Sequence, residues 1–180
     1  VNYAIELSIR YPHTAVVDLD IINPFFRTAD VAEELESRGI KVVAPVFANT
    51  NVDVSALPPD VYAVFSRREY RVVLDVGGDD LGAKVLSRYH DEIANDEYET
   101  YFVINTRRPE TSSEDGVIKY IYEIEESSGF KVDFLVNNTN ILLDTTEKEI
   151  IEGGKLVKRV SEKLGIPVGF TSGLTDLMIH

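Results

Sequence analysis

Cysteine is absent from this 180-residue chain, and so are long hydrophobic runs. The lack of cysteine excludes disulfides, thiolate metal sites and cysteine nucleophiles, which fits an intracellular protein. No stretch approaches the roughly 20 apolar residues of a membrane-spanning helix, and no signal peptide opens the chain. These absences predict a soluble, cytoplasmic protein.

Basic residues are also scarce. The chain has 18 Lys and Arg against 31 Asp and Glu, which gives a formal net charge of -13. That charge repels nucleic acid and anionic lipid over most of the surface, so neither is expected as a partner. The 44% hydrophobic content is enough for one sizeable core, and the composition does not change along the chain. We expect a single domain over residues 1–180.

Apolar runs alternate with helix-like segments along the chain. Six runs predict strands, at residues 14–20, 41–44, 71–75, 101–105, 132–136 and 166–170. They are continuously apolar and do not alternate with polar residues, which is typical of a parallel sheet buried on both sides. The expected fold is therefore α/β, with a parallel sheet of about six strands and helices on both faces in three layers.

Capping residues mark the beginnings of several expected helices. Thr28 is predicted to cap a helix that runs to residue 38. Thr111 with Glu114, and Thr146 with Glu149, have the spacing of a capping box. Further helices are expected at residues 1–11, at 81–93 and in a short segment beginning near residue 59.

Polar residues and glycines stand where three of the expected strands end, and a structural role explains them poorly. They are Asp18 and Asp20, Asp75 with Gly77 and Gly78, and Asn137 with Asn138. The carboxyl ends of parallel strands share one edge of the sheet, where ligands bind in open α/β folds. Carboxylates that converge there could hold a hard cation such as Mg²⁺. The alternative is that these residues only cap turns.

Three motifs resemble those of the MinD, ParA and CobQ group of P-loop ATPases. They are VDLDIINPFFR at residues 17–27, VLDVGG at 73–78 and FLVNN at 134–138. The resemblance covers nearly the whole chain in the same element order. It implies a P-loop NTPase-like fold, ATP and Mg²⁺ as cofactors, and a nucleotide-dependent switch that acts on a protein partner. Dimerisation around nucleotide is common in the group, so a homodimer is one expected assembly.

The resemblance also implies roles for the three aspartates. Asp20 would lie in the first switch and position the attacking water, which makes it the expected catalytic residue. Asp18 would lie beside it, near the magnesium site. Asp75 would hold the magnesium through water, as the Walker B carboxylate does.

The remaining strand-end residues would bind nucleotide if the resemblance holds. Gly78, which follows Gly77, would offer its N–H to the terminal phosphate. Asn137, which precedes Asn138, would read the base, and this is adenine in most of the group. The four residues are thus the expected nucleotide-binding set.

The group's phosphate loop has no counterpart in the sequence. No Gly-x-x-x-x-Gly-Lys-Ser/Thr occurs, although this loop supplies most of the phosphate contacts. The helix that should follow the loop corresponds to residues 1–11. We therefore predict that the chain lacks its natural N-terminus, that it binds nucleotide weakly or not at all, and that it hydrolyses ATP only if the loop is restored.

Two other functions remain open. Amide-forming ligases of the CobQ and dethiobiotin synthetase type share the fold, so an ATP-dependent ligase is the enzymatic alternative. A nucleotide-free scaffold that kept the fold and lost the phosphate chemistry is the alternative from a different class. The glycines at 77, 78 and 82 do not make a dinucleotide loop, because Asp79 stands where Gly-x-Gly-x-x-Gly requires glycine.

Overall fold

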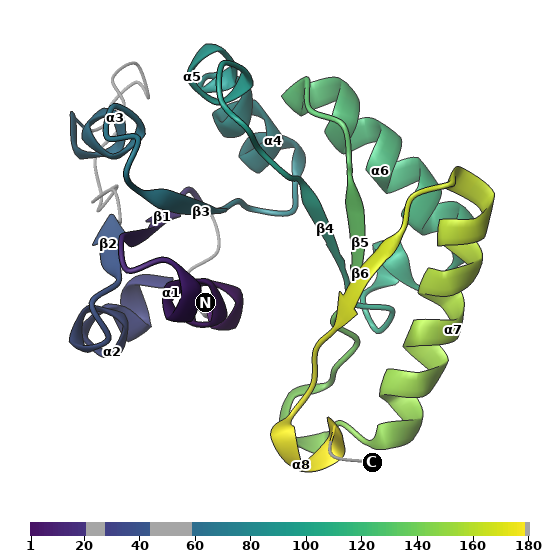
Figure 1. The fold of residues 1–180 in the computed structure, drawn as a ribbon. Coiled ribbons are helices and arrows are strands. Elements are labelled where there is room, and N and C mark those ends of the chain that lie inside the picture. Colours follow the sequence, from purple (N-terminus) through teal and green to yellow (C-terminus); the bar gives the residue numbers. More distant parts are fainter. Residues whose placement is uncertain (21–27, 44–58, 179–180) are drawn as a thin grey trace, which may run out of the picture. The chain divides into compact units, whose positions relative to one another are not determined.

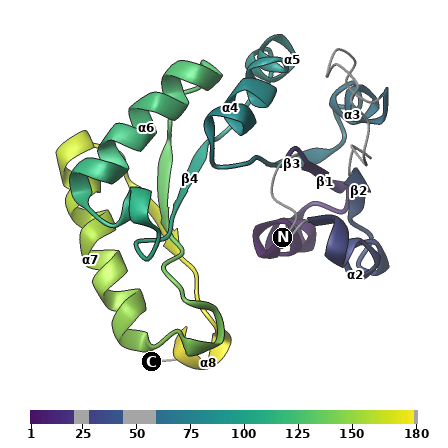
Figure 2. The same cartoon turned by 180° about the vertical axis from the view of Figure 1, so that it is seen from behind.

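The computed structural model describes residues 1–20, 28–43 and 59–178, and the chain divides into two compact units, Val1–Asn95 and Asp96–His180. Each unit is α/β and contains a three-stranded parallel sheet, with the order β2-β1-β3 in the first and β4-β5-β6 in the second (Figures 1 and 2). All six expected strands are present. They pair as two sheets of three and not as one sheet of six, because within the described residues β3 pairs only with β1 and β4 only with β5.

The first unit is built on a short central strand. Its elements are α1 (Asn2–Arg10), β1 (Thr14–Asp18), the 3₁₀ turn η1 (Thr28–Val31), α2 (Ala32–Ser37), β2 (Lys41–Val43), α3 (Pro59–Phe65), β3 (Arg71–Asp75), α4 (Asp80–Ser87) and α5 (His90–Ala94). Every residue of β1 is buried, since β2 and β3 flank it on both sides.

Helices cover both faces of the first sheet, as expected. On one face Val16 of β1 packs with Ala4 of α1 and Leu35 of α2. On the other face Val17 belongs to a core cluster with Val64 of α3 and with residues of α4. Neighbouring residues of a strand point to opposite faces, so a continuously apolar strand is what this three-layer arrangement requires.

The helix expected at residues 81–93 is two helices in the structure. The first, α4, begins after Asp79, whose side chain accepts a hydrogen bond from the N–H of Gly82 at 2.7 Å. Arg88 keeps right-handed helical dihedral angles, but Tyr89 does not, and α5 begins after it. This break lets the fully buried Tyr89 ring pack against Phe65, with ring centroids 5.4 Å apart.

In the second unit two long helices lie against one face of the sheet (Figure 1). Its elements are β4 (Tyr101–Ile104), the 3₁₀ turn η2 (Pro109–Thr111), α6 (Glu114–Ser128), β5 (Phe134–Asn137), the 3₁₀ turn η3 (Leu142–Asp144), α7 (Glu147–Leu164), β6 (Val168–Thr171) and α8 (Thr175–Met178). Ile104 and Leu135 of the sheet, Val117 of α6 and Val157 of α7 form its core. None of the helices in the described ranges is both long and apolar enough to cross a bilayer.

The opposite face of the second sheet carries aromatic side chains. Tyr101 stacks on Phe134 with ring centroids 5.1 Å apart, and Phe170 lies 6.0 Å from Tyr101. Val103 on the same face is mostly exposed. The expectation of helices on both faces thus describes the first unit, whereas α6 and α7 of the second unit pack on a single face.

One of the two expected capping boxes is confirmed. Thr146 and Glu149 form it at the start of α7. The box expected at Thr111 is wrong, because α6 begins after Ser113, whose side chain accepts from the Gly116 N–H at 3.1 Å. The Thr111 hydroxyl instead donates to the carbonyl of Asn105 at 2.7 Å, a tertiary contact that the local spacing does not reveal.

The Tyr89 hydroxyl is expected to lower the free energy of unfolding of the first unit. The side chain is fully buried, burial raises its pKa to about 12, and the hydroxyl has no hydrogen-bond partner within the described structure. Tyr89→Phe removes this desolvated group, so it should raise the free energy of unfolding by about 1 kcal/mol in urea denaturation. The control Tyr62→Phe changes a partly exposed tyrosine and should shift stability by less than about 0.5 kcal/mol. A destabilised Tyr89→Phe variant would contradict this expectation.

Candidate functional site

The first candidate site lies at the carboxyl ends of β1 and β3. Asp18 and Asp75 are direct register partners in this parallel pair. Residues opposite each other in neighbouring strands point to the same face, so the two carboxylates lie side by side. Val16 and Val73, two residues earlier in each strand, place that face on the α1 and α2 side of the sheet.

Asp20 extends the site beyond the end of β1. Its backbone N–H donates to Oδ1 of Asp18 at 3.0 Å, and the backbone N–H of Leu19 donates to the carbonyl oxygen of Asp75 at 2.7 Å. Oδ1 of Asp20 lies 3.1 Å from the position that a Cβ on Gly77 would occupy. The structure therefore brings Asp18, Asp20, Asp75 and Gly77 together at one edge.

Thr28 also belongs to this site, although its place in the sequence predicts a helix cap. Its side chain is fully buried, and its hydroxyl donates to Oδ2 of Asp75 at 2.6 Å. The predicted capping role is wrong, since Thr28 is itself the first residue of the 3₁₀ turn η1. No local pattern signals a contact across 47 residues of sequence. The part of the first motif at 21–27 lies outside the described residues.

The turn between β3 and α4 depends on Gly82 more than on Gly78. A Cβ on Gly82 would collide with the carbonyl oxygen of Gly77, whereas a Cβ on Gly78 would meet no atom within 4 Å. Gly82 thus lets the start of α4 lie directly against the chain that leaves β3. Packing therefore does not require glycine at Gly78.

A magnesium site at this edge stays a prediction. Within the described ranges, no three His, Asp or Glu side chains gather into a metal-binding group. Mg²⁺ commonly keeps several waters and takes only one or two carboxylates, which is what Asp18 and Asp75 offer. Thr28 occupies one oxygen of Asp75, and the other oxygen can accept from a metal-bound water.

The second set of expected residues lies at the carboxyl end of β5. Asn137 is only 1% exposed, and its Nδ2 donates to the carbonyl of Ile150 in α7 at 3.0 Å. Its Oδ1 accepts from the backbone N–H of Thr139 at 3.2 Å and from the Thr139 hydroxyl at 2.7 Å. These contacts fix the chain after β5 onto α7. Base reading by Asn137 stays a prediction, and it would have to compete with them.

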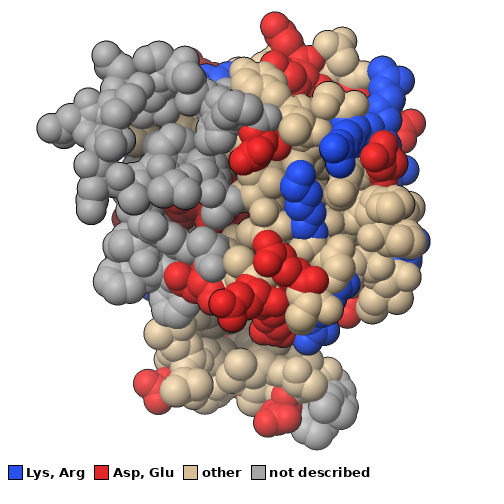
Figure 3. Space-filling view, turned by 90° about the vertical axis from the view of Figure 1, so that its left-hand side faces the viewer, with Lys and Arg blue, Asp and Glu red and all other residues tan. Residues whose placement is uncertain are grey.

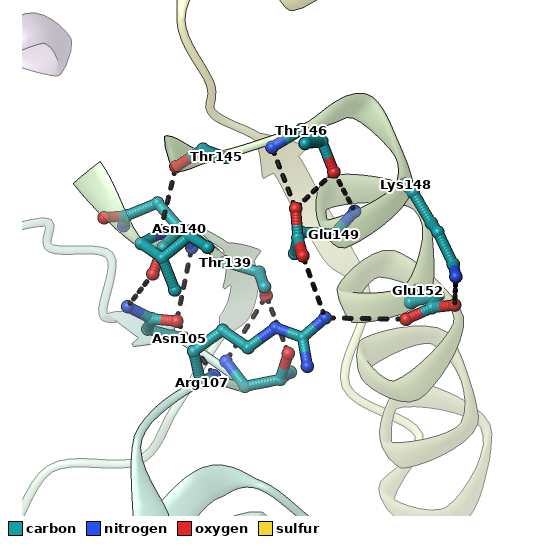
Figure 4. Close-up of polar contacts among 11 residues, drawn as sticks. Asn105, Arg107, Thr139, Asn140, Thr145, Thr146, Lys148, Glu149 and Glu152 are labelled. Atoms are coloured by element: carbon teal, nitrogen blue, oxygen red, sulfur yellow. Dashed lines mark hydrogen bonds and ion pairs between the residues drawn. The ribbon is translucent and has the colours of Figure 1, made fainter. Parts of the chain in front are cut away.

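Asn138 is more accessible than Asn137. Its Oδ1 accepts from the Ser172 hydroxyl at 2.7 Å, which ties the end of β5 to the segment after β6. Figure 4 shows the neighbouring network, in which Asn105 contacts Asn140 and Arg107 points between two glutamates of α7. The guanidinium of Arg107 lies 3.6 Å from Glu149 and 3.5 Å from Glu152. The end of this sheet is thus lined by amides and hydroxyls, with Arg107 held by carboxylates.

Charged side chains are mixed on the described part of the surface in Figure 3. Lys and Arg stand in small groups among acidic and uncharged residues, which is consistent with the excess of 31 acidic over 18 basic residues. An anionic ligand approaching this face would therefore meet cations only in small groups.

The contact between Thr28 and Asp75 should show as a coupling energy. Thr28→Val keeps the side-chain shape but removes the hydroxyl that donates to the carboxylate. A double-mutant cycle with Asp75→Ala, followed by urea denaturation, should give a coupling of about 1–2 kcal/mol. The matched cycle of Thr28→Val with Asp91→Ala uses a fully exposed carboxylate and should give almost none. Equal coupling in the two cycles would rule out the contact.

Comparison with known proteins does not assign the chain to a family. No protein-family model matches the sequence, and no curated protein matches it significantly. The functional interpretation therefore depends on the motif resemblance and on the geometry of the strand ends.

Proposed function

We propose that this chain has a nucleotide-binding fold of the MinD, ParA and CobQ type, which binds ATP with Mg²⁺ and switches the association of a protein partner. The observation that carries the proposal is the register pairing of Asp18 with Asp75, with Asp20 packed against Gly77. Asp18 and Asp75 lie side by side at two adjacent strand ends there, next to the glycine turn that Asp20 contacts. A site of this composition suits a hydrated Mg²⁺ beside a phosphate group.

The proposal includes a P-loop NTPase-like sheet in which all six strands take part. Its support is the pairing of β3, which has β1 on one side and no strand of the described residues on the other. The resemblance places the strand before the phosphate loop beside the Asp75 strand. An edge strand with half-buried apolar residues, as β3 has, is suited to such a neighbour.

Each proposed role belongs to a residue with suitable chemistry. Asp75 would hold a water of the magnesium shell, and Asp18 would supply the adjacent negative charge. Asp20 would orient the water that attacks the terminal phosphate, and the N–H of Gly78 would donate to that phosphate. Bound Mg²⁺ would neutralise charge on the phosphate oxygens and so favour the attack of the water.

A nucleotide-free scaffold is the second candidate function. It is favoured by the hydrogen bonds that Asn137 already makes to Ile150 and Thr139. It is also favoured by the absence of a Gly-x-x-x-x-Gly-Lys-Ser/Thr sequence in the 180 residues. A scaffold would keep the packing of the strand ends and make no use of the carboxylates.

Calorimetric titration with ATP should separate these two functions. The 180-residue chain should bind MgATP with a dissociation constant above about 1 mM. A longer protein, in which a strand and a Gly-x-x-x-x-Gly-Lys-Ser/Thr loop are added before Val1, should bind it at least tenfold more tightly. In the longer protein, Asp75→Ala should lower the affinity for MgATP by about tenfold or more and remove its dependence on Mg²⁺, because the carboxylate that holds the metal shell is lost.

Asp91→Ala is the matched control, since it removes an equally charged but fully exposed carboxylate of the same unit. Its affinity should equal that of the unmodified protein. Unchanged MgATP affinity in Asp75→Ala would overturn the magnesium role, and no ATP binding by the longer protein would favour the scaffold.

A further inference from the structure

Three consecutive aliphatic side chains are exposed between β5 and α7. We call residues 140–145 the Leu142–Leu143 loop. In it Ile141 is 41% exposed, Leu142 61% and Leu143 92%. Single exposed aliphatic residues are common on protein surfaces, but a contiguous group of large ones usually marks an interaction site.

The loop is held in one conformation by its own polar groups. Thr145 is buried, and its hydroxyl accepts from the N–H of Ile141 at 2.9 Å and donates to the carbonyl of Leu142 at 2.6 Å. The N–H of Leu142 donates to Oδ1 of Asn140 at 3.3 Å. Leu142 has a φ of 60°, and it is the only non-glycine residue with positive φ among those described. A backbone with positive φ is unfavourable for a side chain as bulky as leucine. The hydrogen bonds of the loop therefore have to offset this strain at Leu142.

The loop is also fixed to the end of the second sheet. Asn105, which follows β4, donates from Nδ2 to the carbonyl of Asn140 at 3.0 Å and accepts from its N–H at 3.2 Å (Figure 4). The exposed leucines therefore stand on a pre-organised support. Binding through such a loop costs little conformational entropy, which favours docking into a shaped pocket.

Acidic side chains follow the leucines and restrict the kind of partner. Asp144 and Glu147 are exposed, whereas the nearby cation Lys148 lies 3.9 Å from Glu152. An anionic bilayer would be repelled by these carboxylates, and a second copy of the chain would bring the same net charge of -13. A pocket with basic residues at its rim would complement both the leucines and the carboxylates.

We propose that the Leu142–Leu143 loop is a docking site, which inserts Leu142 and Leu143 into an apolar pocket with a basic rim on a protein of different sequence. The inference goes beyond the proposed nucleotide chemistry and does not depend on it. It rests on the exposure, the rigid support and the acidic flank of the loop.

Site-specific photocrosslinking tests this proposal in cells of the native host. A benzophenone amino acid is placed at Leu143, and the control position is Tyr122 on α6, which is 56% exposed and also carries a large apolar side chain. Position 143 should give an adduct with one protein of different sequence, and position 122 should not. That protein is then identified by mass spectrometry and purified for affinity measurements with the 180-residue chain.

Three measurements on the purified pair decide the outcome. Leu143→Asp should weaken binding of the partner by at least about tenfold, whereas Tyr122→Asp should leave it unchanged. Raising the salt concentration should weaken binding of the unmodified chain, because the rim of the partner's pocket is basic. Leu143 is almost fully exposed, so thermal unfolding of Leu143→Asp should match that of the unmodified chain. Adducts only with a second copy or with lipid, no adduct above the control, or unchanged affinity in Leu143→Asp would each overturn the proposal.

Discussion

The parallel pairing of β1 with β3 is the constraint on which the first unit and its candidate site depend. It sets Asp18 opposite Asp75 and brings the chain after each strand to the same edge. The pairing is stabilised by burial of β1, whose side chains pack against helices on both faces. A shift of one residue would turn every side chain to the wrong face, so the core and the carboxylate pair are specified together.

In the second unit, the strand ends are held by uncharged side chains. Asn105, Asn137 and Thr139 direct their side chains at backbone groups and at one another, and they fix the segments that follow β4 and β5. Buried amides are stable only when their hydrogen bonds are satisfied, so this network leaves little freedom for Asn137. The same network supports the loop that presents Leu143. The polar residues at the strand ends of this unit thus hold neighbouring segments together, whereas the strand ends of the first unit carry carboxylates.

Local patterns predicted well wherever the physical cause was local. The box of Thr146 and Glu149 involves residues three apart, and it caps the helix that the sequence predicts there. Thr111 shows the limit of such patterns. It has the same spacing to Glu114 as a capping box, but a more distant acceptor, the carbonyl of Asn105, takes its hydroxyl and Ser113 caps the helix instead.

The sequence by itself determined the six strands, their parallel α/β character and the group of polar residues at the strand ends, because hydrophobic runs and turn residues act over short distances. Only the tertiary structure decided how the strands pair, which is in two sheets of three. It also decided that Thr28 binds Asp75 and that Asn137 is bonded to Ile150, since these contacts join residues 47 and 13 positions apart. Contacts of this kind follow from the packing of whole elements, for which no local pattern exists.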